Sequence, residues 1–160
     1  MYLWTDPQAS LVAEARRINE NMPEETLQIA ERIHGPLLGQ RVLLLGITYR
    51  GDVKETAFSG AFPTIKGILK RGGMVFVHDP LYSNKELEEL DLIPYEKNSS
   101  VDIAIIQADH SEYSNLDLTQ FPGIRTVIDG RGIIRRDNSD AIQIHVLGNQ
   151  KIQFDFYQNF

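Results

Sequence analysis

The chain has 160 residues, of which 42% are hydrophobic and 24% are charged, as in one ordinary globular domain with a helical appendage. Its net charge of −6 disfavours nonspecific attraction to nucleic acid or to an anionic membrane surface. The chain contains no cysteine, which excludes disulfides, thiolate nucleophiles and cysteine-ligated metals within it. No apolar run is long enough to span a membrane and the first residues lack the features of a signal peptide, so we expect a cytoplasmic protein.

Residues 1–38 are predicted to form a helical segment made of two consecutive helices. Asp6 and the proline after it resemble a helix N-cap, and apolar residues then recur at helical spacing as far as Met22. A second helix is expected to begin at Pro23, which two glutamates follow, and to end at Gly35. These helices have no core of their own, so their apolar stripe must pack on another surface, such as a second copy of the chain.

From residue 39 onward the pattern changes to short apolar runs that alternate with helical segments. Continuous apolar runs are typical of strands buried on both faces of a parallel sheet. Four such strands are expected at residues 41–46, 74–78, 101–106 and 126–128. Helices are expected between them, near residues 62–69, 85–90 and 111–115. The alternation predicts an α/β domain over residues 39–160 with a Rossmann-like, doubly wound parallel sheet, preceded by the helical segment.

The end of the chain has a different pattern. Apolar residues alternate over residues 142–146 and again over residues 152–156, with Gly148 between the two stretches. This pattern predicts a terminal hairpin.

Residues 46–56 form a polar loop after the first predicted strand and before a helix, where phosphate-binding loops lie. The loop has glycines at positions 46 and 51 and two cations, Arg50 and Lys54. It matches neither the dinucleotide-binding fingerprint nor a Walker loop. Anion binding is one interpretation, and a surface loop with solvated charges is the other.

A second loop follows the fourth predicted strand. There Arg131 lies between two glycines, directly after Asp129 and Gly130. An arginine at the carboxyl edge of a parallel sheet can present its planar guanidinium to a phosphate or a carboxylate. The alternative interpretation is a tight turn with an exposed arginine.

Other polar residues give weaker signals. Asp79 ends the second strand, where Rossmann folds carry a ribose-binding acid, but it follows Gly46 by 33 positions, which is long for that motif. The four histidines show no metal-ligand spacing, so no metal site is predicted. Asp109 and His110 stand out only as a pair, and a loop histidine is the favoured interpretation. No residue is predicted to be catalytic.

Four segments, in the right order and at compatible spacing, resemble the UDP-glucose/GDP-mannose dehydrogenase family of nucleotide-sugar 6-dehydrogenases. They are a helical stretch with Ala-Arg, Asn and Met-Pro, a Leu-Gly…Tyr-Arg-Gly-Asp loop, a strand ending in Asp-Pro, and an Asp-Gly-Arg turn: residues 15–23, 45–52, 75–80 and 128–131. The resemblance extends to about residue 134. It matches the end of the central dimerisation region, residues 1–38, and the C-terminal UDP-binding domain, residues 39–160.

The resemblance implies a function. Family members oxidise a UDP-sugar or similar nucleotide sugar to the uronic acid, for polysaccharide precursors, with NAD and a covalent cysteine intermediate. The NAD-binding domain and the cysteine segment are not among the matched parts, so we expect this chain alone to bind no NAD and to be catalytically inactive. Its expected partners are the diphosphate of a UDP-sugar and a second copy of the chain, joined through residues 7–34.

The resemblance also assigns individual residues. Tyr49 and Arg50 match an aromatic-lysine pair that meets the substrate's diphosphate region, with arginine in place of lysine. Arg131 matches the arginine of the Asp-Gly-Arg turn, which contacts substrate. The family commonly has an NAD-facing arginine where this chain has Ala57, and Lys54 is the one nearby cation that offers a substitute.

Two other functions compete with the dehydrogenase-fragment reading. The chain is alternatively a stand-alone Rossmann-like binding module without dehydrogenase activity, which the alanine at position 57 favours. It is otherwise mainly a dimerisation unit that acts through its N-terminal helices.

Overall fold

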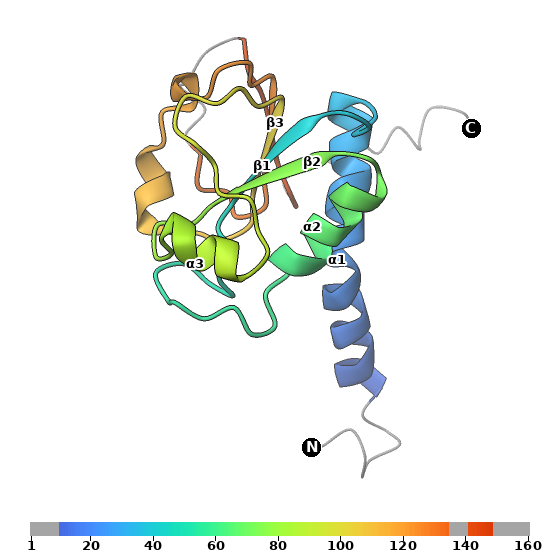
Figure 1. Cartoon of the computed structure of the whole chain (residues 1–160). Helices are drawn as coiled ribbons and strands as arrows, with labels where there is room; N and C mark the ends of the chain where they lie inside the picture. The colour runs from blue at the N-terminus through green and yellow to red at the C-terminus, as the bar shows by residue number, and fades with distance from the viewer. Residues whose placement is uncertain (1–9, 135–140, 149–160) are drawn as a thin grey trace, which may run out of the picture.

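A computed structural model describes residues 10–134 and 141–148 and shows five parallel strands in one sheet, in the order β2-β1-β3-β4-β5 (Figure 1). The strands are β1 (Arg41–Leu45), β2 (Met74–His78), β3 (Ile103–Ile106), β4 (Thr126–Asp129) and β5 (Gln143–Val146). The first four lie where the sequence predicts strands. The predicted fold class, a Rossmann-like doubly wound parallel sheet, is confirmed.

The described residues also form three α-helices and two 3₁₀ segments, of which α1 precedes β1 and the others lie between strands. They are α1 (Ser10–His34), α2 (Ala61–Lys70), α3 (Asn84–Glu89), η2 (Ser111–Asn115) and η3 (Leu118–Gln120). Helix α3 begins with a capping box, in which the Ser83 hydroxyl accepts from the Glu86 N–H and the Glu86 carboxylate accepts from the Ser83 N–H. The segment expected as a helix near residue 111 is a 3₁₀ helix.

Helix α1 corrects the expectation of two helices that meet at Pro23. It is one continuous helix with Pro23 inside it. A proline costs a helix about 3 kcal/mol through a lost hydrogen bond and a steric clash. Contacts beyond the proline offset that cost, because Leu27 is fully buried and Arg71, at the end of α2, pairs with both Glu24 and Glu31 at 2.6 and 3.1 Å. The predicted cap at Asp6 lies outside the described residues.

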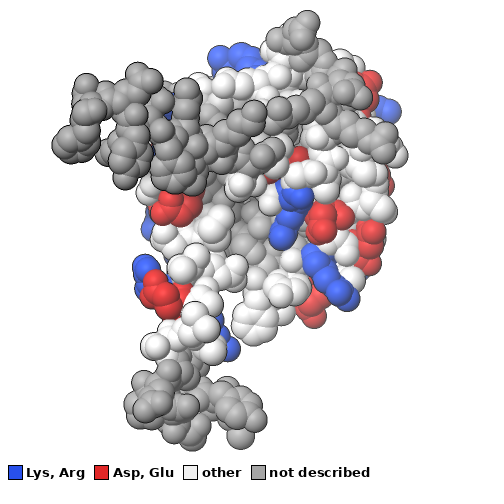
Figure 2. Space-filling view, turned by 180° about the vertical axis from the view of Figure 1, so that it is seen from behind, with Lys and Arg blue, Asp and Glu red and all other residues white. Residues whose placement is uncertain are grey.

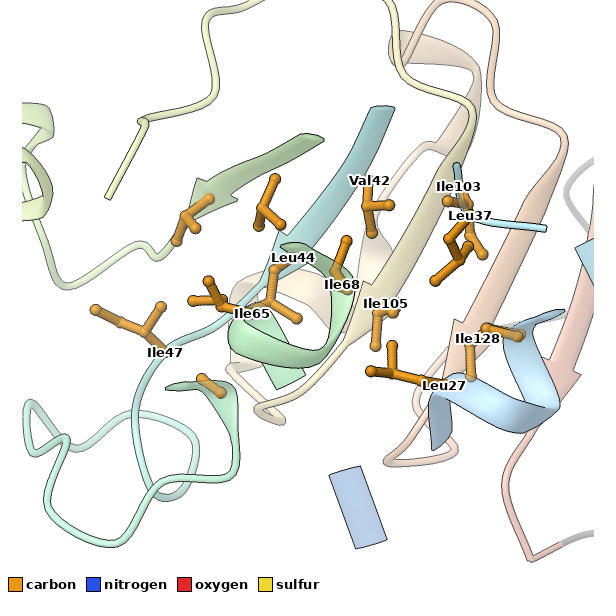
Figure 3. Close-up of a cluster of buried hydrophobic side chains, with 14 of the residues drawn as sticks. Leu27, Leu37, Val42, Leu44, Ile47, Ile65, Ile68, Ile103, Ile105 and Ile128 are labelled. Atoms are coloured by element: carbon orange, nitrogen blue, oxygen red, sulfur yellow. The ribbon is translucent and has the colours of Figure 1, made fainter. Parts of the chain in front are cut away.

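The core lies on both faces of the sheet, because side chains alternate along each strand. Val42 and Leu44 of β1 point to the face that α1 and α2 cover, where they meet Leu27, Ile65 and Ile68 (Figure 3). The opposite face carries a second cluster beneath η2 and η3, with these members among others: Leu43, Leu45, Ala104, Ile106, Tyr113, Leu118 and Phe121. Burial on both faces is the reason that β1, β3 and β4 have nearly continuous apolar sequences.

The two halves of α1 differ in their surroundings. The second half buries Thr26, Leu27 and Ala30, and two of these belong to the core of the sheet domain. Residues 10–22 are exposed, and Figure 1 shows this part of the helix extending beyond the rest of the molecule. The division of the chain after residue 38 stays a prediction.

Strand β5 is the first arm of the predicted terminal hairpin. It pairs in parallel with β4, from Thr126 opposite Gln143 to Asp129 opposite Val146. The second arm, residues 152–156, lies outside the described residues. Within the described part of the chain, no helix is both long enough and apolar enough to cross a membrane.

The strand order reverses between β1 and β3, and this reversal determines where a ligand can bind. The chain leaves β1 toward β2 on one side, and β3 lies on the other side of β1. At such a switch point the loops after the two strands diverge and leave a crevice at the carboxyl edge of the sheet. Gly46 makes the first turn there, with φ of +87°, and a Cβ at this position would lie 2.5 Å from the Cβ of Ala108.

Replacing Gly46 with alanine should therefore destabilise the fold through two effects. The left-handed backbone costs a non-glycine residue about 1–2 kcal/mol, and the clash with Ala108 should raise the total loss to about 3 kcal/mol. Gly39→Ala is the matched control, because Gly39 has φ of +71° but open space where its Cβ would lie. Urea unfolding of both variants separates the two effects, and an equal loss of stability in both would contradict the close contact at Gly46.

Candidate functional site

The carboxyl edge of the sheet brings together the loops that the sequence singles out. The loop after β1 carries Tyr49 and Arg50, and the turn after β4 carries Arg131. Strand β3 lies between β1 and β4 in the sheet. The residues that follow β3 therefore separate the two predicted arginine positions.

The loop after β1 holds Tyr49 and Arg50 outward. The backbone N–H of Tyr49 donates to the carbonyl of Glu55 at 2.8 Å, which closes the loop on itself. Tyr49 is 56% exposed, and the exposed Arg50 side chain has no hydrogen bond or ion pair with any described residue. The next residue, Gly51, donates to Asp109 Oδ1 at 3.0 Å, and a Cβ on Gly51 would lie 2.1 Å from the Asp109 carbonyl oxygen. A glycine is required for the loop to lie this close to the end of β3.

The turn after β4 orients Arg131 toward the same place. The buried carboxylate of Asp129 accepts from the backbone N–H groups of Arg131, Gly132 and Ile134 at 2.7–2.9 Å. The Arg131 side chain reaches across to β3, where its Nε donates to the carbonyl of Gln107 at 2.8 Å. Its two terminal nitrogens have no partner among the described residues and remain available to an anion.

Asp109 connects the two arginine positions. The pKa of its carboxyl is held below its ordinary value, chiefly by the N–H of Gly51, and the positive charge of Arg131 lowers it further. Asp109 is therefore bonded to the residue next to Arg50 and lies within electrostatic reach of Arg131. The loop that carries Tyr49 and Arg50 and the side chain of Arg131 thus both contact the residues that follow β3.

Beneath this edge lies a buried polar network that the sequence analysis missed. His110, 1% exposed, contacts Thr48 Oγ1 and Asp79 Oδ2 through Nε2, at 2.9 and 3.2 Å, and accepts from the Asp52 N–H through Nδ1 at 3.0 Å. Asp79 also accepts from Ile47 N at 2.8 Å. Both side chains face inward, and the Asp79 carboxylate is occupied by backbone N–H groups of the loops around it. His110 lies in a loop, as predicted, but its side chain is buried. Asp109 and His110 come shortly after β3, and only the strand order, which places β3 beside β1, brings His110 to Thr48.

Lys54 is engaged elsewhere. It forms an ion pair with Glu86 of α3, and its ammonium lies 4.7 Å from the centre of the Tyr82 ring. This pairing, followed by hydrogen bonds from Ser83, lowers the pKa of Glu86 to about 2. Ala57 carries no charge and Lys54 is paired with Glu86. Among the described residues of this loop, Arg50 is therefore the one cation without an ion pair.

No group of three or more histidine, aspartate or glutamate residues within the described part of the chain is arranged to hold a metal ion. Figure 2 shows the molecule from behind the view of Figure 1, and acidic and basic side chains lie next to one another on this side. Their proximity fits a chain with mixed charges and a modest negative balance.

Residues 43–136, which include all three strand-end loops, match the model of the UDP-binding domain of the UDP-glucose/GDP-mannose dehydrogenase family. The chain belongs to this family. The resemblance drawn from four sequence motifs is thereby confirmed, and the matched region corresponds to the C-terminal domain of the family's enzymes.

Curated relatives agree with this assignment. A UDP-N-acetyl-D-mannosamine dehydrogenase of Methanocaldococcus jannaschii is 27% identical over 151 residues, which are 89% of this chain and 35% of the relative. A UDP-glucose 6-dehydrogenase of Rickettsia felis is 31% identical over 130 residues, which are 72% of this chain and 28% of the relative. The chain thus spans about a third of the length of the dehydrogenases that it matches.

Solved structures show the same fold. The UDP-N-acetyl-mannosamine dehydrogenase of Staphylococcus aureus superimposes with a TM-score of 0.73 at 25% identity, over 90% of this chain and 35% of that one. A UDP-glucose dehydrogenase from Pyrobaculum islandicum gives a TM-score of 0.66 at 26% identity, over 79% of this chain and 30% of that one.

The Glu86 carboxyl gives a pH-dependent test of the contact between the β1 loop and α3. Its folded-state pKa is depressed, so the contact is complete above the ordinary pKa of 4.5 and is lost as the pH falls toward about 2. In Lys54→Met, the pKa of Glu86 measured by NMR titration should rise, because Lys54 is the largest cause of the shift. Lys85→Met removes the same charge from a pair with Glu89 at 3.8 Å and should leave Glu86 unchanged. Equal titration curves in both variants would contradict the Lys54 contact.

Proposed function

We propose that this chain is the nucleotide-diphosphate-binding end of an NAD-dependent UDP-sugar dehydrogenase, a cytoplasmic enzyme that makes UDP-uronic acids for polysaccharide synthesis. The chain binds the diphosphate of the UDP-sugar at the carboxyl edge of β1, β3 and β4. The oxidation and the use of NAD belong to the whole dehydrogenase. Alone, this chain is catalytically inactive, because it has no cysteine to form the covalent intermediate.

One observation carries the proposal: Arg50 and the terminal nitrogens of Arg131 lie at the switch-point edge without partners among the described residues. Exposed guanidinium groups on both sides of the β3 end suit an elongated dianionic group better than a single carboxylate. Charge-assisted hydrogen bonds from arginine to phosphate oxygens are of the strong kind, and each guanidinium can donate two of them. Tyr49, exposed beside Arg50, adds a phenol ring and hydroxyl at the same position.

The names of the relatives support the choice of ligand. The Methanocaldococcus jannaschii and Rickettsia felis proteins are both named as dehydrogenases of UDP-sugars. The uridine diphosphate is the part of those substrates that does not change with the sugar. A site in this domain for the diphosphate is therefore compatible with either sugar.

Calorimetric titration with UDP tests this function on the 160-residue chain. We expect measurable binding that weakens about tenfold in Arg50→Ala and in Arg131→Ala, since each variant loses charge-assisted hydrogen bonds to a phosphate.

The matched control is Arg32→Ala, because Arg32 is an exposed arginine in the last turn of α1, at the opposite edge of the sheet. It removes the same charge and should leave the affinity unchanged. No heat with UDP or UDP-sugars in the wild-type chain would refute the proposed function. Equal weakening in all three variants would show only an effect of net charge.

We further propose that the chain forms a homodimer through α1, within residues 7–34. The exposed half of the helix carries Leu11, Ile18 and Met22, which are 80%, 53% and 41% exposed and follow one another at i, i+7 and i+11. A short helix without tertiary contacts is marginal in water, so this half needs a partner. A second copy supplies a complementary apolar stripe, whereas the charges of Glu14 and Arg17 pair with each other.

Sedimentation velocity tests the dimer. We expect the wild-type chain to sediment as a dimer and Ile18→Glu as a monomer, because a buried unpaired carboxylate is costly at an interface. Ile93→Glu is the matched control: Ile93 is 59% exposed but lies in the loop before β3, far along the chain from α1. A wild-type monomer at high concentration would refute the interface.

A further inference from the structure

We propose that His110 is a positioning residue for the anion-binding loop: one buried imidazole ring holds both ends of the segment that carries Tyr49 and Arg50. The proposal rests on the proposed function, because it assigns the position of Arg50 to a residue that no ligand can reach. His110 is 1% exposed and therefore acts through the backbone that it holds.

The hydrogen bonds assign the tautomer of the ring. Nδ1 lies 3.0 Å from the backbone nitrogen of Asp52, which can only donate, so Nδ1 accepts and carries no hydrogen. The ring hydrogen is therefore on Nε2. There it points to Asp79 Oδ2 at 3.2 Å and to Thr48 Oγ1 at 2.9 Å. Nδ1 thus contacts one end of the loop after β1, and Nε2 contacts the other end and Asp79.

The ring is itself fixed in place. Asp79, which it contacts, accepts from the backbone N–H groups of Ile47 and Leu81 at 2.8 and 2.9 Å. The Tyr113 ring packs edge-on against the imidazole at a centroid distance of 5.4 Å and an angle of 89°. Because the ring is fixed in this way, it holds the loop after β1 in a defined position relative to the ends of β2 and β3.

The two residues that His110 holds flank the binding segment. Thr48 precedes Tyr49, and Asp52 comes two residues after Arg50. The residues on either side of His110 also bind this loop. Asp109 accepts a hydrogen bond from the Gly51 N–H. The N–H and the hydroxyl of Ser111 both donate to the Asp52 carboxylate. Three consecutive residues after β3 therefore fix the loop after β1.

These contacts hold the backbone of Asp52 in an uncommon conformation. Its φ is +59°, in the left-handed region that a residue with a side chain seldom adopts. Aspartate tolerates this region better than most residues do, and the contacts to His110 and Ser111 hold Asp52 in it. Without the acceptor on Nδ1, the segment is free to leave this conformation, and Arg50 loses its fixed position.

A histidine with a purely structural role would stabilise the fold without fixing the position of Arg50. Two substitutions distinguish this role from the positioning role. In His110→Asn the side-chain oxygen lies near the Nδ1 position, so it keeps the acceptor for Asp52 N–H and loses the contacts of Nε2 with Asp79 and Thr48. In His110→Gln the side-chain amide reaches the Nε2 position, keeps the contact with Asp79, and leaves Asp52 N–H without an acceptor. Both variants remove buried hydrogen bonds, so both thermal unfolding midpoints should fall, and the fall should be at least as large in His110→Asn as in His110→Gln.

The decisive readouts are amide-hydrogen exchange at Gly51 and Asp52 and the calorimetric affinity for UDP. We expect slow exchange in wild type and His110→Asn, and exchange about a hundredfold faster in His110→Gln. UDP affinity should be about tenfold lower in His110→Gln than in His110→Asn. A long-range proton–nitrogen NMR spectrum of the wild type should show the hydrogen on Nε2.

The outcomes separate this proposal from the proposed function. Equal exchange rates in the two variants, or a ring hydrogen on Nδ1, would overturn the positioning role. If the wild type bound no UDP while the exchange rates differed as expected, the proposed function would fail and the positioning of the loop by His110 would stand. If UDP bound equally to both variants, the loop would be held by His110 without effect on the ligand, and the proposal would be wrong.

Discussion

The carboxylate of Asp79, almost completely buried at the end of β2, is the group from which the loops at the switch point are positioned. A buried carboxylate costs several kcal/mol unless it is hydrogen-bonded, and here it receives N–H groups from three segments: residues 47, 81 and 110. Those donors must lie around it for the fold to be stable. The loops after β1 and β3 are thereby fixed relative to each other before any ligand binds.

The centre of the sheet was predictable because β1, β3 and β4 are buried on both faces. Continuous apolar runs, bounded by glycine and by polar loops, leave few alternatives for β1 and β3. Helix α1 was predicted less well, because the rule that proline ends a helix is local. Leu27 and the ion pairs of Arg71 with Glu24 and Glu31 join segments more than 35 residues apart, and no local pattern reports them.

Part of the candidate site was also predictable from the sequence, and part was not. Arg50 and Arg131 were singled out because they follow strands, and topology alone brings strand ends to one edge. Their assignment as substrate contacts came from family resemblance and stays a prediction. The network of Thr48, Asp79 and His110 was not predictable, since Thr48 and His110 are separated by 62 positions and only the strand order places them together.

The charge balance at this edge limits how strongly it can hold an anion. Asp109 is ionised more readily than an ordinary aspartate, because Gly51 donates to it and Arg131 lies near. Its negative charge organises the loop, yet it also repels a diphosphate that approaches Arg131. The same carboxylate therefore stabilises the empty edge and weakens the bound state. We therefore expect this domain to bind UDP only modestly by itself, and we expect tighter binding of a whole UDP-sugar to need contacts beyond the three residues of this edge.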